Sequence, residues 1–364
     1  MIVRSLRLRN FRNYENAYIQ LDEGMNIITG NNAQGKTNLL ESLVYLSLTR
    51  SHRILDEKQL IRTDMPFGDI LCRMEDETEK ELHAVIHNRG KTLMINGNPV
   101  KKSSDFIGRL NVVLFAPDDL YIFNDQPRER RRIMNQEITK ISSQYLISLN
   151  QFQNLLRERN IILKQDRPDE RYLDIIDEQM ADAEAFVIEM RNEFIEAVNG
   201  EMGRLYRELS SDDINVTVQY RCCIADKSDL RAALLAMHKE SRQKDIERRM
   251  TLNGIHREDL IFEINGVSLI RTASQGQKRI VMLAFKMALL RYIRMKTGKK
   301  PVLLLDDVLS ELDENRQKKL LEMVREPYQC LITATEIPTE IKKGNYREFR
   351  VENGTVRMVS GGRQ

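Results

Sequence analysis

The residues best suited to chemistry form a glycine-rich loop near the start of the chain. The loop reads Gly30-Asn31-Asn32-Ala33-Gln34-Gly35-Lys36-Thr37, a complete G-x-x-x-x-G-K-[ST] phosphate loop. Its two glycines let the backbone wrap around phosphate oxygens, so that N–H groups and a helix N-terminus point at the anion. Lys36 is expected to reach the β- and γ-phosphates, and Thr37 to hold Mg²⁺. An apolar, strand-like run precedes the loop and a helical run follows it, so the sequence predicts a nucleoside triphosphate site.

Two adjacent carboxylates in the second half of the chain suit the same chemistry. Asp306 and Asp307 end the apolar, strand-like run Val302-Leu303-Leu304-Leu305. Asp306 is expected to contact Mg²⁺ directly or through water, and Asp307 to orient or deprotonate the attacking water. The expected catalytic residues are therefore Asp307, Asp306 and Lys36. About 270 residues separate the loop from this pair, so a large insertion must divide the phosphate-binding domain.

Composition limits the class of protein. The chain has 364 residues, of which 41% are hydrophobic and 30% charged, and this is enough for two domains or one large one. It contains no run of 18 apolar residues and no apolar core of a secretory signal at its start, so we expect a cytoplasmic protein with no membrane contact. The four cysteines include no C-x-x-C pair, and we expect neither disulfides nor zinc.

Periodicity divides the chain into three segments. Residues 1–124 mix strands with one helix, and they include a β-meander from Ile70 to about Lys101. Residues 251–364 return to mixed α/β character and end in a hairpin around Asn353-Gly354. We expect these two segments to form one ATPase-like head, and residues 125–250 to form a separate helical arm domain.

The middle segment shows helical spacing. Apolar residues step by three or four from Met134 to Leu156 and from Leu173 to Leu209, with a polar break at 165–169. This predicts two long antiparallel helices of about 30 to 40 residues, or about 45 to 60 Å each. The alternative is an internal helical subdomain that does not project. Residues 213–250 stay unassigned, and an alternating strand from Ile214 to Tyr220 could belong to either domain.

Several motifs in register resemble the ATP-binding-cassette ATPases. A Ser274-Gln275-Gly276-Gln277 signature precedes the helical run Ile280 to Ile293, and Ser310-Glu311-Leu312-Asp313 follows the carboxylates. A head split by a helical hairpin resembles the SMC-like branch, and further matching motifs cover essentially the whole chain: Leu8 to Tyr14, Ser51 to Arg53, Phe115 to Leu120 and His256 to Leu260. The resemblance implies an α/β fold: a cassette-type P-loop ATPase head with a mixed sheet and an antiparallel β lobe, interrupted by the hairpin arm.

The resemblance also implies a function. It indicates ATP and Mg²⁺ as cofactors, with Gly30 to Thr37 of one subunit and Ser274 to Gln277 of another closing on each ATP in a homodimer that forms on ATP binding. Such a dimer would clamp DNA independently of its sequence, and weak DNA-stimulated hydrolysis would reset it. Relatives of this kind act in recombinational repair and replication restart beside RecR and RecO, where they promote recombinase loading at gaps.

Three departures limit this transfer. Asp307 stands where most cassette ATPases have a glutamate, and its shorter side chain suits slow hydrolysis. Thr333-Ala334-Thr335 stands where many members have a switch histidine. A glutamine is also missing near Phe115-Ala116-Pro117, where another cation contact is usual.

Charge distribution gives a weaker indication of DNA binding. Residues 125–250 hold 21 Lys and Arg against 24 Asp and Glu, so the basic excess lies outside the arm segment, in a chain of net charge +3. Within the arm segment, four arginines cluster at the expected base of the hairpin and are candidate DNA contacts: Arg128, Arg130, Arg131 and Arg132. The alternative is that they form solvated faces or internal ion pairs.

Three other functions remain open from the residues. A transporter's nucleotide-binding subunit fits poorly with the split head and the missing histidine. A scaffold that binds ATP and DNA without using hydrolysis is compatible with Asp307. A nuclease would need a further catalytic domain, and no residues are left after the head to form one.

Overall fold

The computed structural model describes residues 1–124, 126–210, 212–325 and 328–359, which divide into two compact units. The head unit comprises Met1–Leu120, Arg204–Asp213 and Arg279–Gln364, and the arm unit comprises Tyr121–Gly203 and Ile214–Lys278. The arm unit is larger than the predicted 125–250 segment because residues 259–264 pair with a strand inside it. The expected boundaries at 125 and 364 lie outside the described residues. Among the helices described, none is both long and apolar enough to cross a membrane.

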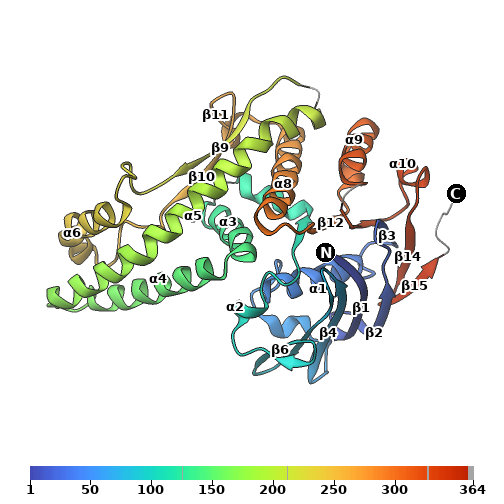
Figure 1. The fold of residues 1–364 in the computed structure, drawn as a ribbon, viewed down its shortest axis with the longest axis horizontal. Helices are drawn as coiled ribbons and strands as arrows, with labels where there is room; N and C mark the ends of the chain where they lie inside the picture. The colour runs from blue at the N-terminus through green and yellow to red at the C-terminus, as the bar shows by residue number, and fades with distance from the viewer. Residues whose placement is uncertain (125, 211, 326–327, 360–364) are drawn as a thin grey trace. The chain divides into compact units, whose positions relative to one another are not determined.

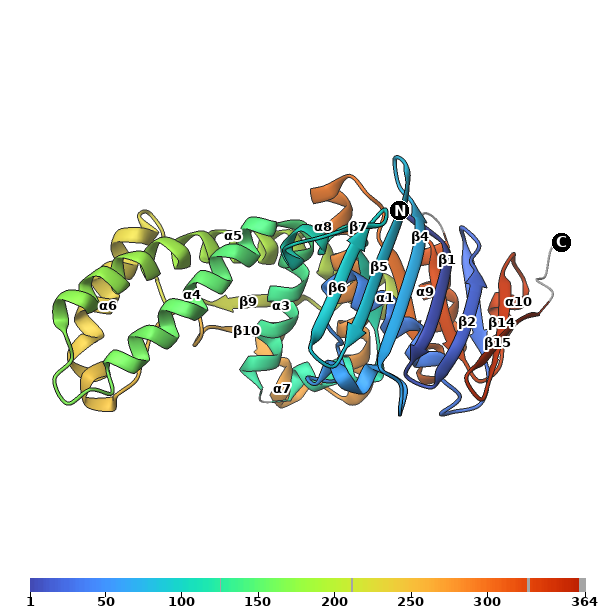
Figure 2. The ribbon, with the colours of Figure 1, turned by 90° about the horizontal axis from the view of Figure 1, so that it is seen from below.

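The first sheet of the head unit is antiparallel, with strand order β2-β1-β4-β5-β6-β7. Figure 2 shows β6, β5, β4, β1 and β2 side by side in this order. Its strands are β1 Ile2–Phe11, β2 Tyr14–Gln20, β4 Phe67–Glu75, β5 Glu79–His87, β6 Gly90–Ile95 and β7 Asn98–Pro99. Tight turns join β4 to β5 to β6 to β7, and this confirms the predicted meander.

The second sheet of the head unit is mixed, with strand order β15-β14-β3-β13-β12-β8. Its strands are β3 Met25–Thr29, β8 Val112–Phe115, β12 Val302–Asp306, β13 Cys330–Ala334, β14 Arg347–Glu352 and β15 Thr355–Val359. Every neighbouring pair is parallel except β14 and β15, which form the predicted C-terminal hairpin. Parallel strands end at the same edge of a sheet, so the loops after β3 and β12 meet there although they are far apart in sequence.

A single helix fills the space between the two sheets. Helix α1, Lys36–Leu48, is buried at every position from Leu39 to Leu48 and contacts strands of both sheets. Its apolar residues therefore surround the axis, as expected for a helix with no solvent face. The remaining short elements of the head are η1 Glu57–Leu60, α2 Ser103–Phe106, η3 Leu309–Glu311, α9 Glu314–Arg325 and α10 Thr339–Lys342. Three elements span a boundary between units: η2 Pro117–Phe123, α5 Glu170–Ser210 and α8 Gln275–Thr297.

The arm unit is a group of helices with a small sheet. Its further elements are α3 Pro127–Ile141, α4 Ser143–Ile162, α6 Leu230–Arg248, α7 Leu269–Thr272, β9 Val216–Arg221, β10 Asp259–Ile264 and β11 Val267–Ser268. Helices α4 and α5 run side by side (Figure 1), and Tyr145 contacts Arg191 while Arg159 contacts Asp177. Because partner numbers fall along α5 as they rise along α4, the pair is antiparallel, as predicted.

Two features of the arm differ from the sequence prediction. The first predicted helix is interrupted at Ser142, whose side chain accepts a hydrogen bond from the Tyr145 N–H and caps α4. The apolar seam crosses this break, so periodicity alone could not reveal it. The unassigned region 213–250 contains β9, which pairs with β10 in the arm unit, and a third long helix, α6.

A buried ionic cluster joins the three long helices of the arm. Arg159 on α4 donates to Asp177 on α5 at 2.7 Å and to Asp245 on α6 at 2.8 Å. All three side chains are fully buried. Thr251 accepts a further hydrogen bond from Arg159 at 2.9 Å. Charges removed from water in this way depend on one another, because the loss of one leaves its partner unpaired in a medium of low dielectric.

This cluster predicts an asymmetry between two acids of helix α5. Asp177→Asn removes one buried negative charge and should lower the free energy of unfolding of the arm by about 3–5 kcal/mol. Asp182→Asn breaks the Arg231–Asp182 pair, whose side chains are 53% and 57% exposed, and should leave stability unchanged. Urea denaturation followed by circular dichroism measures both, and equal effects of the two variants would contradict this role for the cluster.

Candidate nucleotide-binding site

The phosphate loop between β3 and α1 has the shape its glycines require. Gly30 and Gly35 have φ values of 148° and 115°, in the region that side chains rarely adopt. A Cβ at Gly30 would lie 2.4 Å from the Val351 carbonyl oxygen, and one at Gly35 would lie 2.5 Å from the Asn13 side chain. The loop is therefore held between the turn after β1 and the C-terminal hairpin, with no room for larger residues at either position.

Side chains around the loop hold its backbone in place. Asn13 donates to the Gln34 carbonyl at 2.7 Å, and the Tyr14 hydroxyl donates to the Gly35 carbonyl at 2.8 Å. Lys36 is buried, and its ammonium lies over the loop and donates to the Gly30 carbonyl at 2.7 Å. Asn31, Asn32 and Ala33 form the outer part of the loop. The Lys36 ammonium also donates to the Asn31 carbonyl at 3.2 Å, so two backbone carbonyls of the loop fix this cation.

The predicted cation ligands are brought together. Thr37, in the first turn of α1, donates its hydroxyl to Asp306 Oδ1 at 2.9 Å. Asp306 ends β12 and is only 6% exposed. Burial raises the pKa of Asp306, while hydrogen bonds from Thr333 and Thr37 oppose this rise. A hydroxyl and a carboxylate at this separation form a small set of oxygen donors of the kind Mg²⁺ prefers.

Asp307 has an unusual backbone conformation. Its φ is +50°, in the left-handed region, which turns the chain sharply after β12. The Asp307 N–H donates to the Thr333 hydroxyl at 2.9 Å, and the Asp307 carbonyl accepts from Ser310 at 2.6 Å. The two carboxylates predicted to act together therefore emerge from one turn with different exposures, because Asp306 is buried and Asp307 half-buried.

These residues fit a nucleoside triphosphate with a divalent cation. Gly30 and Gly35 let the loop pack against Val351 and Asn13, and the first turn of α1 carries no acidic residue to repel phosphate oxygens. A cleft of about 600 Å³ adjoins the loop. Its lining includes Gly30, Asn31 and Gln34 of the loop, the cations Lys342 and Arg350, and three glutamates, Glu336, Glu348 and Glu352. A second hollow, of about 900 Å³, lies on the antiparallel sheet, but its arginines pair with carboxylates and it offers no comparable anion site.

The signature residues begin helix α8. Ser274 and Gln277 form a reciprocal capping box, because the Ser274 N–H donates to the Gln277 side chain at 2.9 Å and the Gln277 N–H donates to the Ser274 hydroxyl at 3.2 Å. Ser274 and Gln275 are exposed. A Cβ at Gly276 would meet only one atom within 4 Å, at 3.9 Å. The fold of this chain therefore gives no steric reason for glycine at this position.

The arginine cluster differs from the expected DNA-binding surface. Arg130 is buried and makes two hydrogen bonds of 2.7 Å to Asp259, so it cannot serve as a phosphate contact. Arg131 donates to the Glu258 carbonyl at 2.5 Å, and Arg132 pairs with Glu129 at 2.6 Å. Arg128 is exposed. The alternative of internal pairing is therefore correct for Arg130, because helix α3 packs this face against β10.

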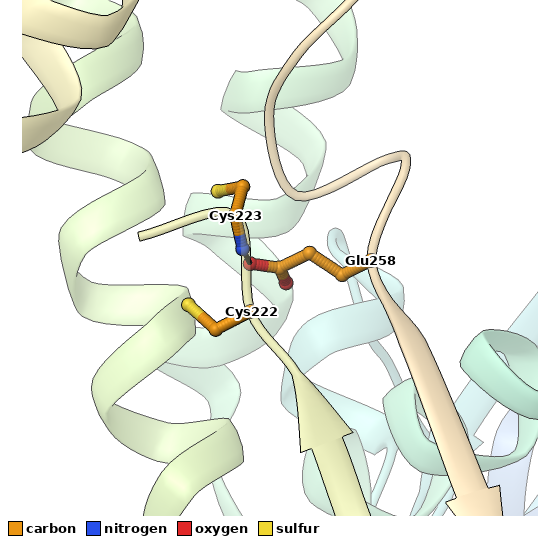
Figure 3. A group of neighbouring side chains, drawn as sticks. All are labelled: Cys222, Cys223 and Glu258. Atoms are coloured by element: carbon orange, nitrogen blue, oxygen red, sulfur yellow. Dashed lines mark hydrogen bonds between the residues drawn. The ribbon is translucent and has the colours of Figure 1, made fainter. Parts of the chain in front are cut away.

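A second group of ligand-type side chains lies in the arm (Figure 3). Cys222, Cys223 and Glu258 place their sulfur and carboxylate atoms within 4.8 Å of one another. The Glu258 carboxylate also accepts from Arg191 at 2.5 Å, from the Tyr220 hydroxyl, and from the Cys223 N–H at 3.1 Å. The charge of this carboxylate is thus balanced by a buried guanidinium. The group anchors the end of β9 to the start of β10, and its arrangement does not favour a cation.

Two residues that contact the nucleotide site were not predicted as site residues. Asn13 and Thr333 each contact the predicted site residues, yet neither belongs to a phosphate-loop or carboxylate motif. Asn13 lies within the matching run Leu8 to Tyr14, and this run was the available signal for it. Thr333 begins the Thr333-Ala334-Thr335 run noted at the position of the switch histidine, but its contact with Asp306 follows only from the pairing of β13 with β12.

Comparison with known proteins agrees with this geometry. Residues 2–356 match the RecF/RecN/SMC N-terminal domain. The chain is similar to the DNA replication and repair proteins RecF of Clostridium botulinum (strain ATCC 19397, 38% identical over 99% of this chain and 100% of the relative) and Clostridium novyi (36% identical, 98% and 99%). It also resembles a solved structure of the recombination mediator protein RecF with ATP in the RecFOR pathway, with a TM-score of 0.91 and 32% identity over 99% and 98% of the two chains.

More distant structures match in fold alone. A Smc head domain from Pyrococcus furiosus, solved with an extended coiled coil and bound to the C-terminal domain of ScpA, gives a TM-score of 0.57 at 16% identity over 98% and 96% of the two chains. Together these likenesses confirm the predicted fold class, a cassette-type P-loop head of the SMC-like branch interrupted by a helical arm.

The conformation of Gly30 predicts that adding one methyl group at this position strongly weakens nucleotide binding. Gly30→Ala should weaken nucleoside triphosphate binding by about one to two orders of magnitude, because a strained residue costs about 1–3 kcal/mol and the loop must leave this shape. Gly24→Ala, just before the same strand, would place its Cβ 3.7 Å from the nearest atom and serves as the control. Equilibrium binding of a fluorescent ATP analogue is the measurement. Unchanged nucleotide binding by Gly30→Ala would show that the phosphate loop does not need glycine at this position.

Proposed function

Because the chain belongs to the RecF/RecN/SMC N-terminal domain family, and its curated relatives at 38% identity are RecF proteins, we propose that it is an ATP-dependent DNA-binding protein of recombinational repair and replication restart. The relatives support the role in repair, and the observation that carries the dependence on ATP is the 2.9 Å hydrogen bond from Thr37 to Asp306. It joins the phosphate loop to the carboxylate strand and thereby makes one site from the two ends of the chain.

The cofactors of the proposed site are ATP and Mg²⁺. Backbone N–H groups from Gly30 to Thr37 and the Lys36 ammonium would bind the phosphates, and Thr37 and Asp306 would hold the cation. When bound, Mg²⁺ supplies charge that neutralises the phosphoryl oxygens. Asp307 would orient or deprotonate the attacking water, and its half-buried carboxylate is short for that task. Weak, DNA-stimulated hydrolysis that acts as a switch is the expected activity.

A homodimer that forms on ATP binding would complete the site. Ser274, Gln275, Gly276 and Gln277 lie at the N-terminus of the 23-residue helix α8, whose positive end suits a γ-phosphate held by another subunit. Gly276 supports this reading, because the fold of one chain does not require glycine there and a close approach by a second molecule would. Two heads would then close on two ATP molecules.

The proposed partner of the closed dimer is DNA, gripped without base recognition. Arg128 is the exposed member of the predicted cluster, and such contacts weaken steeply with salt. A solved relative is described as a mediator of the RecFOR pathway. We therefore include RecR and RecO as partners, and recombinase loading at gaps as the outcome. Slow hydrolysis would reopen the clamp.

A scaffold that binds ATP and DNA without functional use of hydrolysis is the second candidate. Asp307 favours it, because an aspartate reaches less far than the glutamate usual in cassette ATPases and its backbone is fixed in a left-handed turn. The two candidates differ in one respect: hydrolysis is needed to release DNA in the first and is dispensable in the second.

Two variants separate binding from hydrolysis. Lys36→Ala should abolish ATP binding, whereas Asp307→Asn should keep ATP binding and lower turnover by about 10²- to 10⁴-fold, the usual contribution of a general base. Asp307→Asn should also accumulate as an ATP-bound dimer. Nucleotide binding, phosphate release and sedimentation measure the three effects. Wild-type turnover in Asp307→Asn would remove Asp307 from the mechanism.

A nucleotide site shared between two subunits predicts that some variants lose dimerisation but keep ATP binding. Ser274→Arg adds bulk and charge where a second subunit must approach, so it should leave ATP binding by the monomer within about twofold but weaken dimerisation at least about tenfold. Met295→Arg adds the same side chain at a 62% exposed position of the same helix and is the control. Normal ATP-driven dimerisation of Ser274→Arg would exclude a site shared between subunits.

A further inference from the structure

Strand β13, which lies between β3 and β12, contributes the side chain of Thr333 to the site. β13 pairs with β3 on one side and with β12 on the other, and its register places Thr333 directly opposite Asp306. Thr333 is fully buried. A buried hydroxyl must find a donor and an acceptor nearby, and at this position both come from the turn that carries the two aspartates.

The Thr333 hydroxyl makes two hydrogen bonds with opposite roles. It donates to Asp306 Oδ1 at 2.7 Å, and it accepts from the Asp307 N–H at 2.9 Å. The Thr333 side chain therefore fixes both the orientation of the Asp306 carboxylate and the backbone of Asp307. The Asp307 backbone is in the left-handed region, with φ of +50°, and such a conformation persists only where the surroundings hold it.

Both hydroxyls near Asp306 contact the same oxygen. Thr37 and Thr333 each donate to Oδ1, and neither uses Oδ2. The two hydroxyls differ in one respect. Thr37 is itself an expected cation ligand, whereas Thr333 lies on the neighbouring strand β13 and belongs to none of the motifs that hold a cation. Thr333 can therefore keep its bond to Oδ1 while Asp306 serves as a ligand.

We propose that Thr333 is a positioning residue for the cation and water groups of this site: its hydroxyl holds the Asp306 carboxylate for the divalent cation and the Asp307 turn for the attacking water. This rests on the proposed function, since it presumes that Asp306 receives a divalent cation with ATP. Groups that orient a metal ligand typically change metal affinity or activity by about 10- to 100-fold when they are removed. The inference also explains why the residue at 333 is polar in an otherwise apolar strand.

The test compares isosteric variants by cation binding. Thr333→Val keeps the shape and loses the hydroxyl, and Thr333→Ser keeps the hydroxyl. Thr139→Val is the matched control, because Thr139 is buried in the arm and its hydroxyl has no hydrogen-bond partner among the described residues. The affinity for a fluorescent ATP analogue is measured in EDTA and then in a titration with Mn²⁺, which requires no turnover.

The expected result separates the cation from the nucleotide. Thr333→Val should weaken Mn²⁺-dependent binding by about 10- to 100-fold and leave binding in EDTA within about twofold. Thr333→Ser and Thr139→Val should match the wild type. Amide exchange gives an independent readout, since the Asp307 N–H should be protected in the wild type and exchange faster in Thr333→Val.

Different outcomes overturn different claims. Wild-type Mn²⁺ affinity and unchanged Asp307 exchange in Thr333→Val would overturn the role of Thr333 and leave the proposed function intact. A wild-type chain that binds no nucleotide would overturn the proposed function, and with it this inference. If Thr333→Val does not fold, Thr333→Cys carries the same comparison, because a thiol of similar size is a weaker hydrogen-bond donor.

Discussion

The parallel pairing of three short strands is the constraint on which the rest of the head depends. β13 lies between β3 and β12, so the loop after β3 and the carboxylates after β12 end at one edge of the sheet. Nothing local in the chain joins these segments, which come from its two ends. The buried helix α1 supports the arrangement, because it packs against both sheets and places Thr37 within 2.9 Å of Asp306.

The arm combines an apolar seam with buried ion pairs. Fully buried ion pairs, such as those of Arg159 and Arg191, link its helices to one another and to the segment before β10. Such pairs are costly to desolvate and tolerate little rearrangement, so they specify geometry more than they add stability. Apolar packing is common to both units, and in the arm buried ion pairs add matched charges between its long helices.

Local signals in the sequence predicted much of the fold. The phosphate loop, β3, α1, β12 and the terminal hairpin each have a short pattern with a direct physical meaning, and each lies where it was expected. Features set by contacts between distant residues were not predictable. From the sequence, Arg130 reads as a surface cation, and only the fold shows that it pairs with Asp259. Likewise, only the fold shows that the Thr333 hydroxyl contacts Asp306. The break between α3 and α4 at Ser142 was not predicted, because the apolar spacing continues across it.

Sedimentation of the wild-type chain with and without ATP–Mg²⁺ and duplex DNA, at low and high salt, tests whether ATP closes two heads around DNA. We expect a monomer without nucleotide, a dimer with ATP–Mg²⁺, and DNA that travels with the dimer and is released as salt rises. A monomer that ignores ATP, or a constant dimer that ignores DNA, would contradict this closure.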